Sequence, residues 1–528
     1  MRQENDYDRY DSDDRRPLVF LAIIAVLVVA VTGLGVGYLN LHSRLSTSEL
    51  DAKRAVLLMD KLQGQVNGFD NKLQTSETKT QNELLAATQA LINDAKGSIV
   101  KSVDGSAAPS RTATFVVCAS NAANTNQCDF VADGTDDQTE INLALAALPP
   151  SGGNVHLSEG SFSINGVAKT FGGILIQKSN VVLAGSGMGT KLTLTGGNRD
   201  TNVIRIIGNN LENITIRDMW IDANSTKQIS TNQFEVIGIK ARSPNLDQPM
   251  RNIVVENTRI ENCLELCIYL YGAGVFIRNN WIGDAGGDTV ELLGGPGEIA
   301  DNHFEISGAS GRIISVDAGD NINLVNNTID VRPGGSAYAA IRSWAGYSGI
   351  NIQNNVITAS GPMVYAVTSF SSSSLISGNI IRPWDGAANP KLLISAGKTT
   401  LSDNHIENTD IVVDDSQAPG DVVIRDNILD KVTISSTSKN LKISRNVGYT
   451  TENSGTVIVP KGATTTVVNH GLVAAPTNVQ LTPINNPANS IAWYWVSNIT
   501  ATQFTVNVST DPGTSGSTFS WRATVGEG

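Results

Sequence analysis

The sequence predicts an all-β protein whose main body is a right-handed parallel β-helix with an N-terminal capping helix. Two observations predict this fold. A short unit of aliphatic residues and asparagine recurs with a period near 24 residues. One isolated amphipathic helix precedes these units, and hardly another helical pattern follows it. A transmembrane helix and a coiled-coil stalk are expected before the body, and a small β-sandwich after it.

The bulk composition limits the partners that can be expected. The chain has 528 residues, a net charge of −12 and only 17% charged residues. Nucleic acid is not an expected partner, because its binding needs clustered lysine and arginine. The 41% of hydrophobic residues argues against global disorder. The five histidines are scattered, so neither a metal site nor a cofactor is expected.

Residues 18–39 form an apolar run without a charge and predict a single-pass membrane anchor. Its 22 residues span about 33 Å as a helix, enough for the hydrocarbon core of a bilayer. A cleaved signal peptide is the alternative, but the run is long for one and no small-residue cleavage site is obvious. The membrane is therefore an expected partner.

The orientation of the anchor follows from what lies on its two sides. All four cysteines and five glycosylation sequons lie in the large C-terminal part, which fits an external location. The sequons begin at Asn213, Asn224, Asn326, Asn498 and Asn507. The acidic tail of residues 1–17 is expected inside, and the rest at a cell surface or on a virion envelope.

Residues 40–104 read as a coiled-coil stalk. Apolar or small residues recur at alternating spacings of three and four from Leu45 to Leu73, and resume in a shifted register at Leu84. This is a seam with a stutter. A lone stalk helix is the alternative, but a helix this long and polar needs partners, so self-association is favoured. Residues 105–112 then read as a linker.

Residues 113–174 are expected to close the N-terminal end of the β-helix. Asp137 can cap a helix over residues 137–148, with Glu140 completing a capping box, and Pro149 ends it. The first coil of a β-helix has bare strand edges and an exposed core. The helix is therefore expected to be a lid. Its apolar stripe consists of Ile141, Ala144, Leu145 and Leu148.

The repeat itself occupies residues 175–453. Its unit has six positions, as in "IRNNWI" and "LVNNTI". The first is aliphatic and the second is variable. The third is commonly Asn or Asp, the fourth is usually a second Asn, the fifth is variable, and the sixth is aliphatic or aromatic. The second asparagines are Asn280, Asn302, Asn327, Asn355, Asn379, Asn404, Asn427 and Asn446. Their spacings vary from 19 to 28 residues, which excludes rigid helical repeats, and the leucine-rich frame is absent.

A parallel β-helix explains both the residue type and the variable spacing. Strands stay in register from coil to coil while turns absorb insertions. The second asparagine is expected at a sharp turn, where it tolerates the left-handed region and bonds to neighbouring backbone. Stacked amides would form a ladder, and the flanking aliphatic residues would stack inside. About ten coils give a rod of about 50 Å.

The start of this region resembles the pectate-lyase-like superfamily with the pectin-lyase fold, in its tailspike-like branch. The resemblance is carried by "ADGTDDQTEINLALAALPPSGGNVHLSEGSFSI" and "NVVLAGSGMGTKLTL", and it covers residues 115–449. The shared positions are Asp133, Gly134, Asp136, Asp137, Gly152 and Gly153. Only Thr135 separates the glycine from the aspartate pair, where many members have two residues. The resemblance implies the fold, says little of chemistry, and suggests a trimer.

Residues 454–528 alternate as strands of a small β-sandwich. This segment is similar to lectin-like end modules that follow β-helices in phage-tail and archaeal surface proteins. Such modules often bind sugars or hold subunits together. The module is also expected to cover the second open end of the rod.

The catalytic motifs of related enzymes are not complete. The polygalacturonase-like set needs Asn-Thr-Asp, Asp-Asp, Gly-His-Gly and Arg-Ile-Lys on successive coils. Residues 408–410 and 414–415 supply the first two, but within one coil, and the others do not follow. The calcium carboxylates of pectate lyases find no match either.

The best carboxylate cluster lies in three successive coils. Asp288, Glu291 and Asp317 are the catalytic candidates. Ligand-binding candidates are Asp284, Asp320, Arg342, Trp344 and Tyr347. Paired carboxylates beside an aromatic platform could hydrolyse a glycosidic bond. The same residues could instead only hold a sugar, or be solvated turn residues with a surface ion pair between Asp317 and Arg342.

The four cysteines allow two disulfides. A bond between Cys118 and Cys128, closing a short loop, is favoured over free thiols. Cys263 and Cys267 are too far apart to bond if their segment is fully extended, but a coil corner could bring them together. That second pairing stays open, with buried thiols as the alternative.

Three functions fit this organisation. The leading hypothesis is a non-enzymatic surface spike or adhesin that recognises a polysaccharide or glycoconjugate. The first alternative is a membrane-tethered polysaccharide depolymerase of tailspike type, a glycoside hydrolase or lyase. The second is a purely structural envelope or coat protein.

Overall fold

The computed structural model describes residues 113–525 except 169, 233, 384–388, 439 and 485–490. The expected acidic tail, membrane anchor, coiled-coil stalk and linker all fall in residues 1–112, outside the described residues. Among the helices that the structure does describe, none has the length and apolar character needed to cross a membrane.

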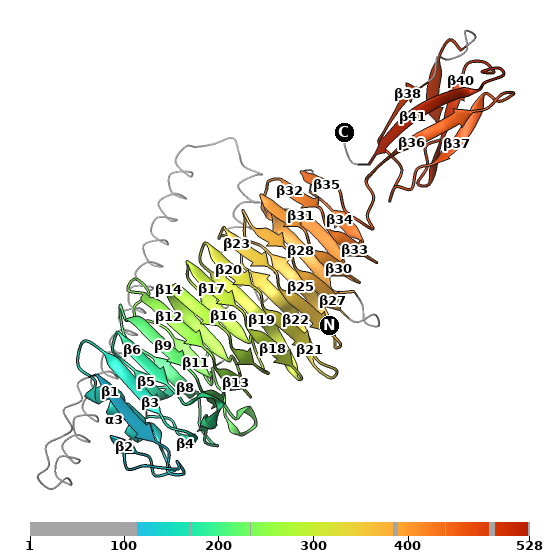
Figure 1. The fold of residues 1–528 in the computed structure, drawn as a ribbon. Coiled ribbons are helices and arrows are strands. Elements are labelled where there is room, and N and C mark those ends of the chain that lie inside the picture. The colour runs from blue at the N-terminus through green and yellow to red at the C-terminus, as the bar shows by residue number, and fades with distance from the viewer. Residues whose placement is uncertain are drawn as a thin grey trace, which may run out of the picture.

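The main body is a parallel β-helix, as the sequence predicted. The chain winds through three sheets, here called A, B and C. After the first two strands, which both belong to sheet A, each turn of the chain adds one strand to each sheet in that order (Figure 1). The paired strands of these sheets are parallel, for example β12 (Met250–Glu256) with β14 (Ile268–Arg278), and β18 (His303–Ile306) with β21 (Thr328–Val331).

The strands of the three sheets have these bounds. Sheet A contains β1 (Thr114–Cys118), β2 (Phe130–Val131), β3 (Gly153–Leu157), β6 (Val181–Ala184), β9 (Glu212–Arg217), β12 (Met250–Glu256), the second half of β14 (Ile268–Arg278), β17 (Gly297–Ala300), β20 (Ile322–Val325), β23 (Ile350–Gln353), β26 (Leu375–Ser377), β29 (Thr399–Ser402), β32 (Val422–Arg425) and β35 (Leu441–Ser444). Sheet B contains β4 (Gly160–Ile164), β7 (Thr190–Leu194), β10 (Trp220–Asp222), β13 (Arg259–Glu261), β15 (Trp281–Ile282), β18 (His303–Ile306), β21 (Thr328–Val331), β24 (Val356–Ala359), β27 (Ile380–Pro383), β30 (His405–Glu407) and β33 (Ile428–Asp430). Sheet C contains β5 (Gly172–Ile176), β8 (Asn202–Ile206), β11 (Ile239–Ala241), the first half of β14, β16 (Val290–Leu293), β19 (Ala309–Ala318), β22 (Ser336–Ser343), β25 (Met363–Ser369), β28 (Lys391–Ala396), β31 (Asp410–Ala418) and β34 (Ile434–Ser436). Two 3₁₀ turns, η1 (Gly187–Gly189) and η2 (Ser225–Lys227), interrupt the early coils.

The core is made of stacked aliphatic columns. The first aliphatic residue of each repeat unit pairs with its counterpart one coil on, from Val255 and Ile277 to Ile424 and Ile443. Most members of this column are fully buried in one cluster that runs from the lid to Leu429. Side chains alternate across a strand, so each inward residue leaves its neighbours facing outward.

The asparagines form a ladder at the corner between sheets A and B. Each of Asn280, Asn302, Asn327, Asn355, Asn379, Asn404 and Asn427 donates its backbone N–H and its side-chain Nδ2 to Oδ1 of the next asparagine, at 2.9–3.1 Å. Asn446 ends the ladder, and Thr258 begins it by donating to Asn280.

One detail of the asparagine prediction was wrong. The residue with positive φ is the one before the ladder asparagine, as in Asn279 (φ 56°), Asn326 (57°) and Asn354 (54°). The ladder asparagines themselves are buried and do not adopt the left-handed region. Two consecutive residues thus have different roles. The first forms the sharp turn, and the second buries its side-chain amide.

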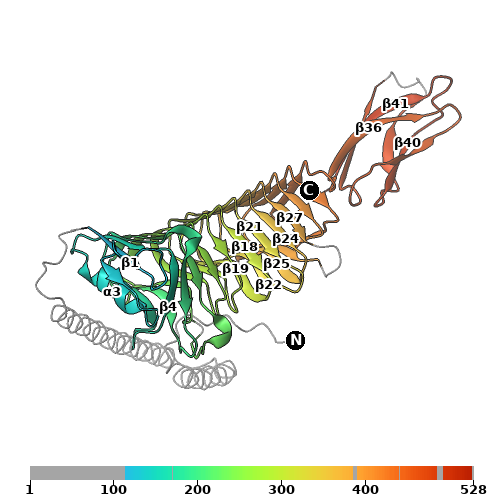
Figure 2. The same ribbon diagram turned by 60° about the horizontal axis from the view of Figure 1, so that its bottom comes forward.

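Helix α3 (Gln138–Ala147) lies across the N-terminal end of the rod (Figures 1 and 2). Ile141, Ala144, Leu145 and Leu148 are buried in the main core cluster. The helix also completes the first strand of sheet C, because the Asn142 amide accepts from Leu175 N at 2.8 Å and donates to Gly173 O at 2.9 Å.

The capping box expected at the start of this helix is absent. Asp137 makes no side-chain hydrogen bond to its own helix. Its buried carboxylate instead accepts from Gly134 N and Ser163 N, both at 2.7 Å. The aspartate therefore ties the Asp-Gly turn to β4, and the helix start is fixed through tertiary contacts.

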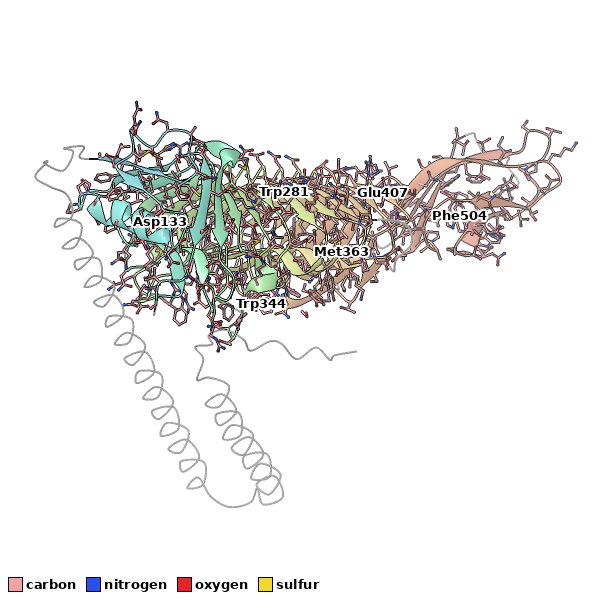
Figure 3. All side chains as sticks on the ribbon, turned by 90° about the horizontal axis from the view of Figure 1, so that it is seen from below. Asp133, Trp281, Trp344, Met363, Glu407 and Phe504 are labelled. Atoms are coloured by element: carbon pink, nitrogen blue, oxygen red, sulfur yellow. A yellow bond between two sulfur atoms is a disulfide. The ribbon has the colours of Figure 1, made fainter. Side chains whose placement is uncertain are left out.

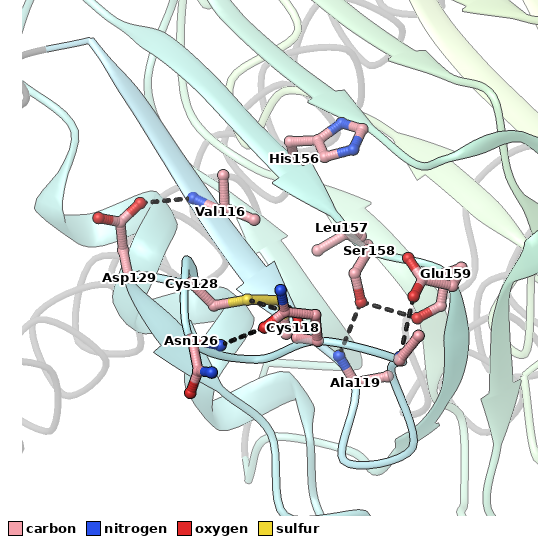
Figure 4. The surroundings of a disulfide bond; sticks show 12 residues. Val116, Cys118, Ala119, Asn126, Cys128, Asp129, His156, Leu157, Ser158 and Glu159 are labelled. Carbon is pink, nitrogen blue, oxygen red and sulfur yellow. Dashed lines mark hydrogen bonds between the residues drawn. A yellow bond between two sulfur atoms is a disulfide. The ribbon is translucent and has the colours of Figure 1, made fainter.

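Both cysteine pairs are bonded in the structure. Cys118 and Cys128 close the loop between β1 and β2, where Val116 N donates to the Asp129 carboxylate at 2.8 Å (Figure 4). Cys263 and Cys267 have Cα atoms 5.3 Å apart, because the chain turns a corner between them.

The C-terminal residues form two three-stranded antiparallel sheets. One contains β36 (Glu452–Val459), β41 (Ser517–Thr524) and β38 (Asn478–Pro483), and the other β37 (Thr465–Asn469), β40 (Gln503–Val508) and β39 (Tyr494–Ser497). Their core, with Phe504, Phe519 and Trp521, is a cluster separate from that of the β-helix. Tyr449, which precedes these sheets, packs on the core of the rod.

Candidate functional site

The outer face of sheet C carries a column of polar and charged side chains. Strand register places Arg205, Lys240, Tyr269, Glu291, Ser315 and Arg342 side by side on successive coils. Each follows a core-facing aliphatic residue, so period-2 alternation turns it outward. The column is nevertheless largely buried, since Lys240, Glu291 and Arg342 are only 2%, 5% and 6% exposed.

The three predicted catalytic carboxylates gather near the middle of this column. Asp288 precedes β16, Glu291 lies on it, and Asp317 lies on β19 of the next coil. Arg312 N donates to Asp288 Oδ1 at 2.8 Å, and the Arg312 guanidinium lies 3.6 Å from the same oxygen. Ser315 Oγ donates to Asp317. We call Asp288, Glu291, Asp317, Arg312 and Arg342 the carboxylate cluster.

Asp317 owes its position to an irregularity in sheet C. Leu292 pairs with Val316, whereas Leu293 pairs with Ala318, so Asp317 is an extra residue on β19. Such a bulge bends the strand and re-aims a side chain. Without the bulge, Asp317 would occupy the regular position opposite Leu293, and its side chain would not be displaced.

The surroundings of Glu291 and Asp288 favour the protonated form of both carboxyl groups. Burial raises the pKa of Glu291 well above its usual value, and the charges of Asp317 and Asp288 raise it further. Arg342 and Arg312 oppose this rise only in part. Burial also raises the pKa of Asp288, against the attraction of Arg312. A carboxylic acid that stays protonated can donate a proton or a hydrogen bond.

Aromatic rings flank the cluster on two sides. The Arg342 guanidinium lies 3.7 Å from the Trp344 ring centre, and that ring packs against Phe370 at 5.9 Å. The Arg312 guanidinium lies 5.3 Å from the Tyr338 ring, which packs against Tyr365 at 5.4 Å. Arg312 is thus held between the Asp288 carboxylate and the Tyr338 ring, and Arg342 stacks on Trp344.

The other predicted ligand-binding residues have different surroundings. Asp284 Oδ1 accepts from Ser307 N and Gly308 N, and Asp320 Oδ1 accepts from Ser348 N and Oγ. Both aspartates thereby fix the turn of the next coil. Tyr347 lies near the site. Burial raises its pKa most, and the nearby Tyr271, Asp320 and Asp317 raise it further.

A buried ion network at the start of the column was not predicted from the sequence. Glu235 accepts from Arg205 Nη1 at 3.0 Å, from Lys240 Nζ at 2.6 Å and from Asn202 Nδ2. Burial lowers the pKa of Lys240 to about 8, although Glu235 opposes this. The signal was present in "IRI" and "IKA", where a cation stands between two core residues, but Glu235 comes from a loop with no such pattern.

Arg312 was missed as well, although it precedes two core residues of β19. Nothing in the local sequence shows that it would meet Asp288 from the coil before. In the described part of the chain, no group of three or more histidine, cysteine, aspartate or glutamate side chains is placed to hold a metal ion.

Comparisons with known proteins give short or distant matches. No family model matches the chain. The chain is 30% identical over 143 residues to the mannuronan C5-epimerase AlgE6 and 38% identical over 107 residues to alginate lyase 7, both of Azotobacter vinelandii. These matches cover 26% and 19% of this chain, and only 16% and 12% of the relatives' own lengths.

Solved structures with a similar course of the chain are all low in identity. The A-module of A. vinelandii AlgE6 is 16% identical, with a TM-score of 0.40 over 60% of this chain and 96% of that one. DFA-IIIase from Arthrobacter chlorophenolicus A6 gives 14% and 0.41 over 61% and 88%. The tailspike protein of E. coli bacteriophage HK620 gives 10% and 0.41 over 74% and 90%.

The strand pairing and the asparagine ladder decide the fold independently of these comparisons. Successive coils pair in parallel through three sheets, and buried amides link coil to coil at one corner. The chain is therefore a parallel β-helix protein, the fold that its capping segment and its asparagine repeat predicted.

Proposed function

We propose that this protein binds a polysaccharide on the outer face of sheet C, at the carboxylate cluster. The observation that carries this proposal is the pair of arginine–aromatic stacks on either side of three carboxylates. Aromatic rings pack on the apolar faces of sugars, while carboxylates and guanidinium groups bond to hydroxyl or carboxyl groups. The in-register strands repeat this face along the rod, which suits a chain-like ligand.

The test compares two tryptophans in different parts of the protein. Binding to alginate, to neutral mannan and to bacterial O-antigen is measured by calorimetry; alginate is included because the curated relatives are named for mannuronan and alginate. Trp344→Ala is expected to weaken binding about tenfold, or about 1.4 kcal/mol. Trp493→Ala removes an indole that is 65% exposed in the C-terminal sheets, and should leave binding unchanged.

If Trp493→Ala weakened binding and Trp344→Ala did not, recognition would lie in the C-terminal sheets and the proposal would be overturned. Absence of binding to every polysaccharide would favour the purely structural alternative instead.

A second candidate function is cleavage of the bound chain, and the raised pKa of Glu291 favours it. In this reaction Glu291 gives its proton to the glycosidic oxygen as the bond from that oxygen to the anomeric carbon breaks. In one route Asp317 takes the proton from a water molecule that attacks the anomeric carbon. In the other route Asp317 attacks that carbon itself, and a water molecule then replaces Asp317 while giving its proton to Glu291. The products are two shorter chains, one with a new reducing end.

Release of reducing ends tests this second candidate. Glu291→Gln and Asp317→Asn are each expected to lower the rate by about 10²-fold or more. Glu305→Gln is the matched control, because Glu305 is a carboxylate that pairs with Arg332 on sheet B. Full activity in both cluster variants would reject these residues. No cleavage of any polysaccharide would leave the protein as a binding spike.

We also propose that residues 1–112 anchor the protein in a membrane, with the N-terminus inside, and join several chains, in a trimer by the tailspike resemblance. The apolar run and the heptad-like seam of the sequence support this. Membrane fractionation, protease protection and chemical crosslinking of the full chain test it. A monomeric protein that is released from membranes by high salt would contradict it.

A further inference from the structure

The outer face of sheet B carries a second ordered column of side chains. Strand register places Lys191, Trp220, Arg259, Trp281 and His303 next to one another on successive coils. The Arg259 guanidinium lies between two indoles, 5.0 Å from the Trp220 ring and 4.0 Å from the Trp281 ring. Lys191 Nζ lies 4.0 Å from the Trp220 ring. The two tryptophans are therefore held by stacking before any ligand arrives.

Carboxylates on the same strands balance these cations. Asp222 lies 3.0 Å from Lys191 Nζ, and Glu261 lies 2.7 Å from Arg259 Nη2. The column is thus rigid and carries no large excess of charge. A ligand recruited mainly by charge, such as a phosphate or a polyanion, would find little net attraction here.

A pocket of about 460 Å³ opens beside this column. Its lining is formed by Met188, Asn257, Thr258, Arg259, Asn279 and Trp281. Met188 lies on η1 and is 50% exposed, so its thioether is open to a ligand. The pocket therefore joins a thioether and an indole, both apolar, to a wall of amides.

The amides of this wall have hydrogen-bonding capacity to spare. Asn279 Nδ2 donates to Asn257 Oδ1 at 2.5 Å, and Asn257 Nδ2 donates to Asp218 Oδ1 at 3.2 Å. An amide nitrogen carries two hydrogens, so each of these groups keeps one further donor. Their left-handed backbone conformation, with φ of 53° and 56°, sets them at the corner beside the pocket.

We propose that this pocket is a second saccharide-binding site, for an uncharged hexose unit. The apolar C–H face of a pyranose fits against Trp281 and Met188, and its hydroxyl groups meet the amides of Asn257 and Asn279. The compensated charge of Arg259 favours a neutral sugar over a uronate. The site lies on a different sheet from the carboxylate cluster, and Trp281 and Trp344 mark different sides of the rod (Figure 3). It does not depend on the function proposed for sheet C.

The test uses the full chain carrying Trp344→Ala, so that binding on sheet C is weakened about tenfold. Cellohexaose, maltohexaose, mannohexaose and an alginate hexasaccharide are titrated by calorimetry. At least one neutral hexasaccharide is expected to bind. Trp281→Ala should weaken that binding about tenfold or more, and Met188→Ala about threefold to fivefold. Met188→Ala guards against misfolding, because its exposed side chain lies outside the core and the thermal unfolding midpoint should not move.

Leu246→Ala is the matched control, since Leu246 is also an exposed aliphatic side chain but lies away from the pocket lining. Its affinity should equal that of the parent. The proposal would be overturned if the Met188 and Trp281 variants bound with the same affinity as the parent, or if no neutral hexasaccharide bound. Binding of the alginate hexasaccharide alone would overturn the assignment to a neutral sugar. If Trp344→Ala has no effect in the native chain, the proposal for sheet C fails, while the Met188 comparison still decides this site.

Discussion

At the scale of single residues, two consecutive asparagines in the repeat do different work. In the fourth coil of the ladder, Asn354 takes the left-handed conformation and Asn355 donates its buried amide to the next coil. Asn355 Oδ1 also accepts two hydrogen bonds from Asn327. Both residues look alike in sequence, yet only the second is fully buried.

Replacing these two neighbours is expected to have unequal effects. Asn355→Ala leaves buried donors of Asn327 without an acceptor and should lower the free energy of unfolding by about 3 kcal/mol. The free energy of unfolding of Asn354→Gly should stay within about 1 kcal/mol of the parent. Glycine adopts positive φ without strain, and this gain offsets part of the larger conformational entropy that glycine loses on folding. Denaturant unfolding measures both. Similar losses in the two variants would contradict the division of tasks.

The titration of Glu291 predicts a pH dependence of stability. Its pKa in the folded protein lies above the ordinary 4.5, mainly because it is buried. As pH rises above 4.5 the unfolded chain releases this proton while the folded chain keeps it. The folded state then binds more protons, so stability falls with rising pH until the folded pKa is passed.

Glu291→Gln removes this term and keeps the shape of the protonated side chain. The stability of the native protein should therefore decrease, relative to Glu291→Gln, as pH rises from 4.5. Thermal unfolding of both proteins at a series of pH values measures the difference. Parallel stability curves would show that Glu291 titrates as an ordinary solvated carboxyl.

At the scale of elements, α3 closes the rod in two ways. Its apolar face completes the core, and Asn142 supplies the hydrogen bonds that a further strand would have made to β5. Lys178 adds a second link, because its Nζ donates to Ala146 O at 2.7 Å and also to Leu148 O at the end of the helix. A bare edge strand invites pairing with other chains, and the lid prevents this.

Asn142→Ala tests the second of these roles. The buried N–H of Leu175 and the carbonyl of Gly173 would both lose their partner, so the free energy of unfolding should fall by about 2 kcal/mol. Thr139→Ala on the exposed side of the same helix is the control, and should be neutral or slightly stabilising. Chemical denaturation compares the two. A neutral Asn142→Ala variant would mean that water replaces the amide at this edge.

At the scale of the whole molecule, the rod and the C-terminal sheets have separate hydrophobic cores. The rod gains stability coil by coil, since each coil packs on its neighbours. The C-terminal sheets are antiparallel and draw on residues of their own segment only (Figure 1). Damage to one core should therefore not spread to the other.

Phe504→Ala is expected to destabilise only the C-terminal sheets. Phe504 is fully buried there, and its truncation should cost about 3–5 kcal/mol. Calorimetry of the full chain should show one transition shifted to lower temperature and the transition of the β-helix unchanged. A single transition that shifts as a whole would show that the two cores unfold together.

The sequence by itself determined the fold of the rod, because a β-helix repeats the same local demand at every coil. Aliphatic residues must face inward, and a short turn needs one left-handed residue followed by a polar side chain that can be buried. These demands leave a period in the sequence, which is why the eight ladder asparagines could be named. The catalytic candidates Asp288, Glu291 and Asp317 could be named because residues at similar depth on successive coils lie near one another, although the register pairs Glu291 with Ser315 and not with Asp317.

Only the tertiary structure decided the contacts between segments that are far apart in the sequence and share no repeat pattern. Asp137 bonds to Gly134 and Ser163 and not to its own helix, Arg312 meets Asp288 across coils, and Glu235 enters from a loop to join Arg205 and Lys240. The bulge that re-aims Asp317 is likewise invisible in the repeat. Local pattern fixes which way a strand residue faces, but the partners of a buried charge depend on loops whose course only the packed molecule sets.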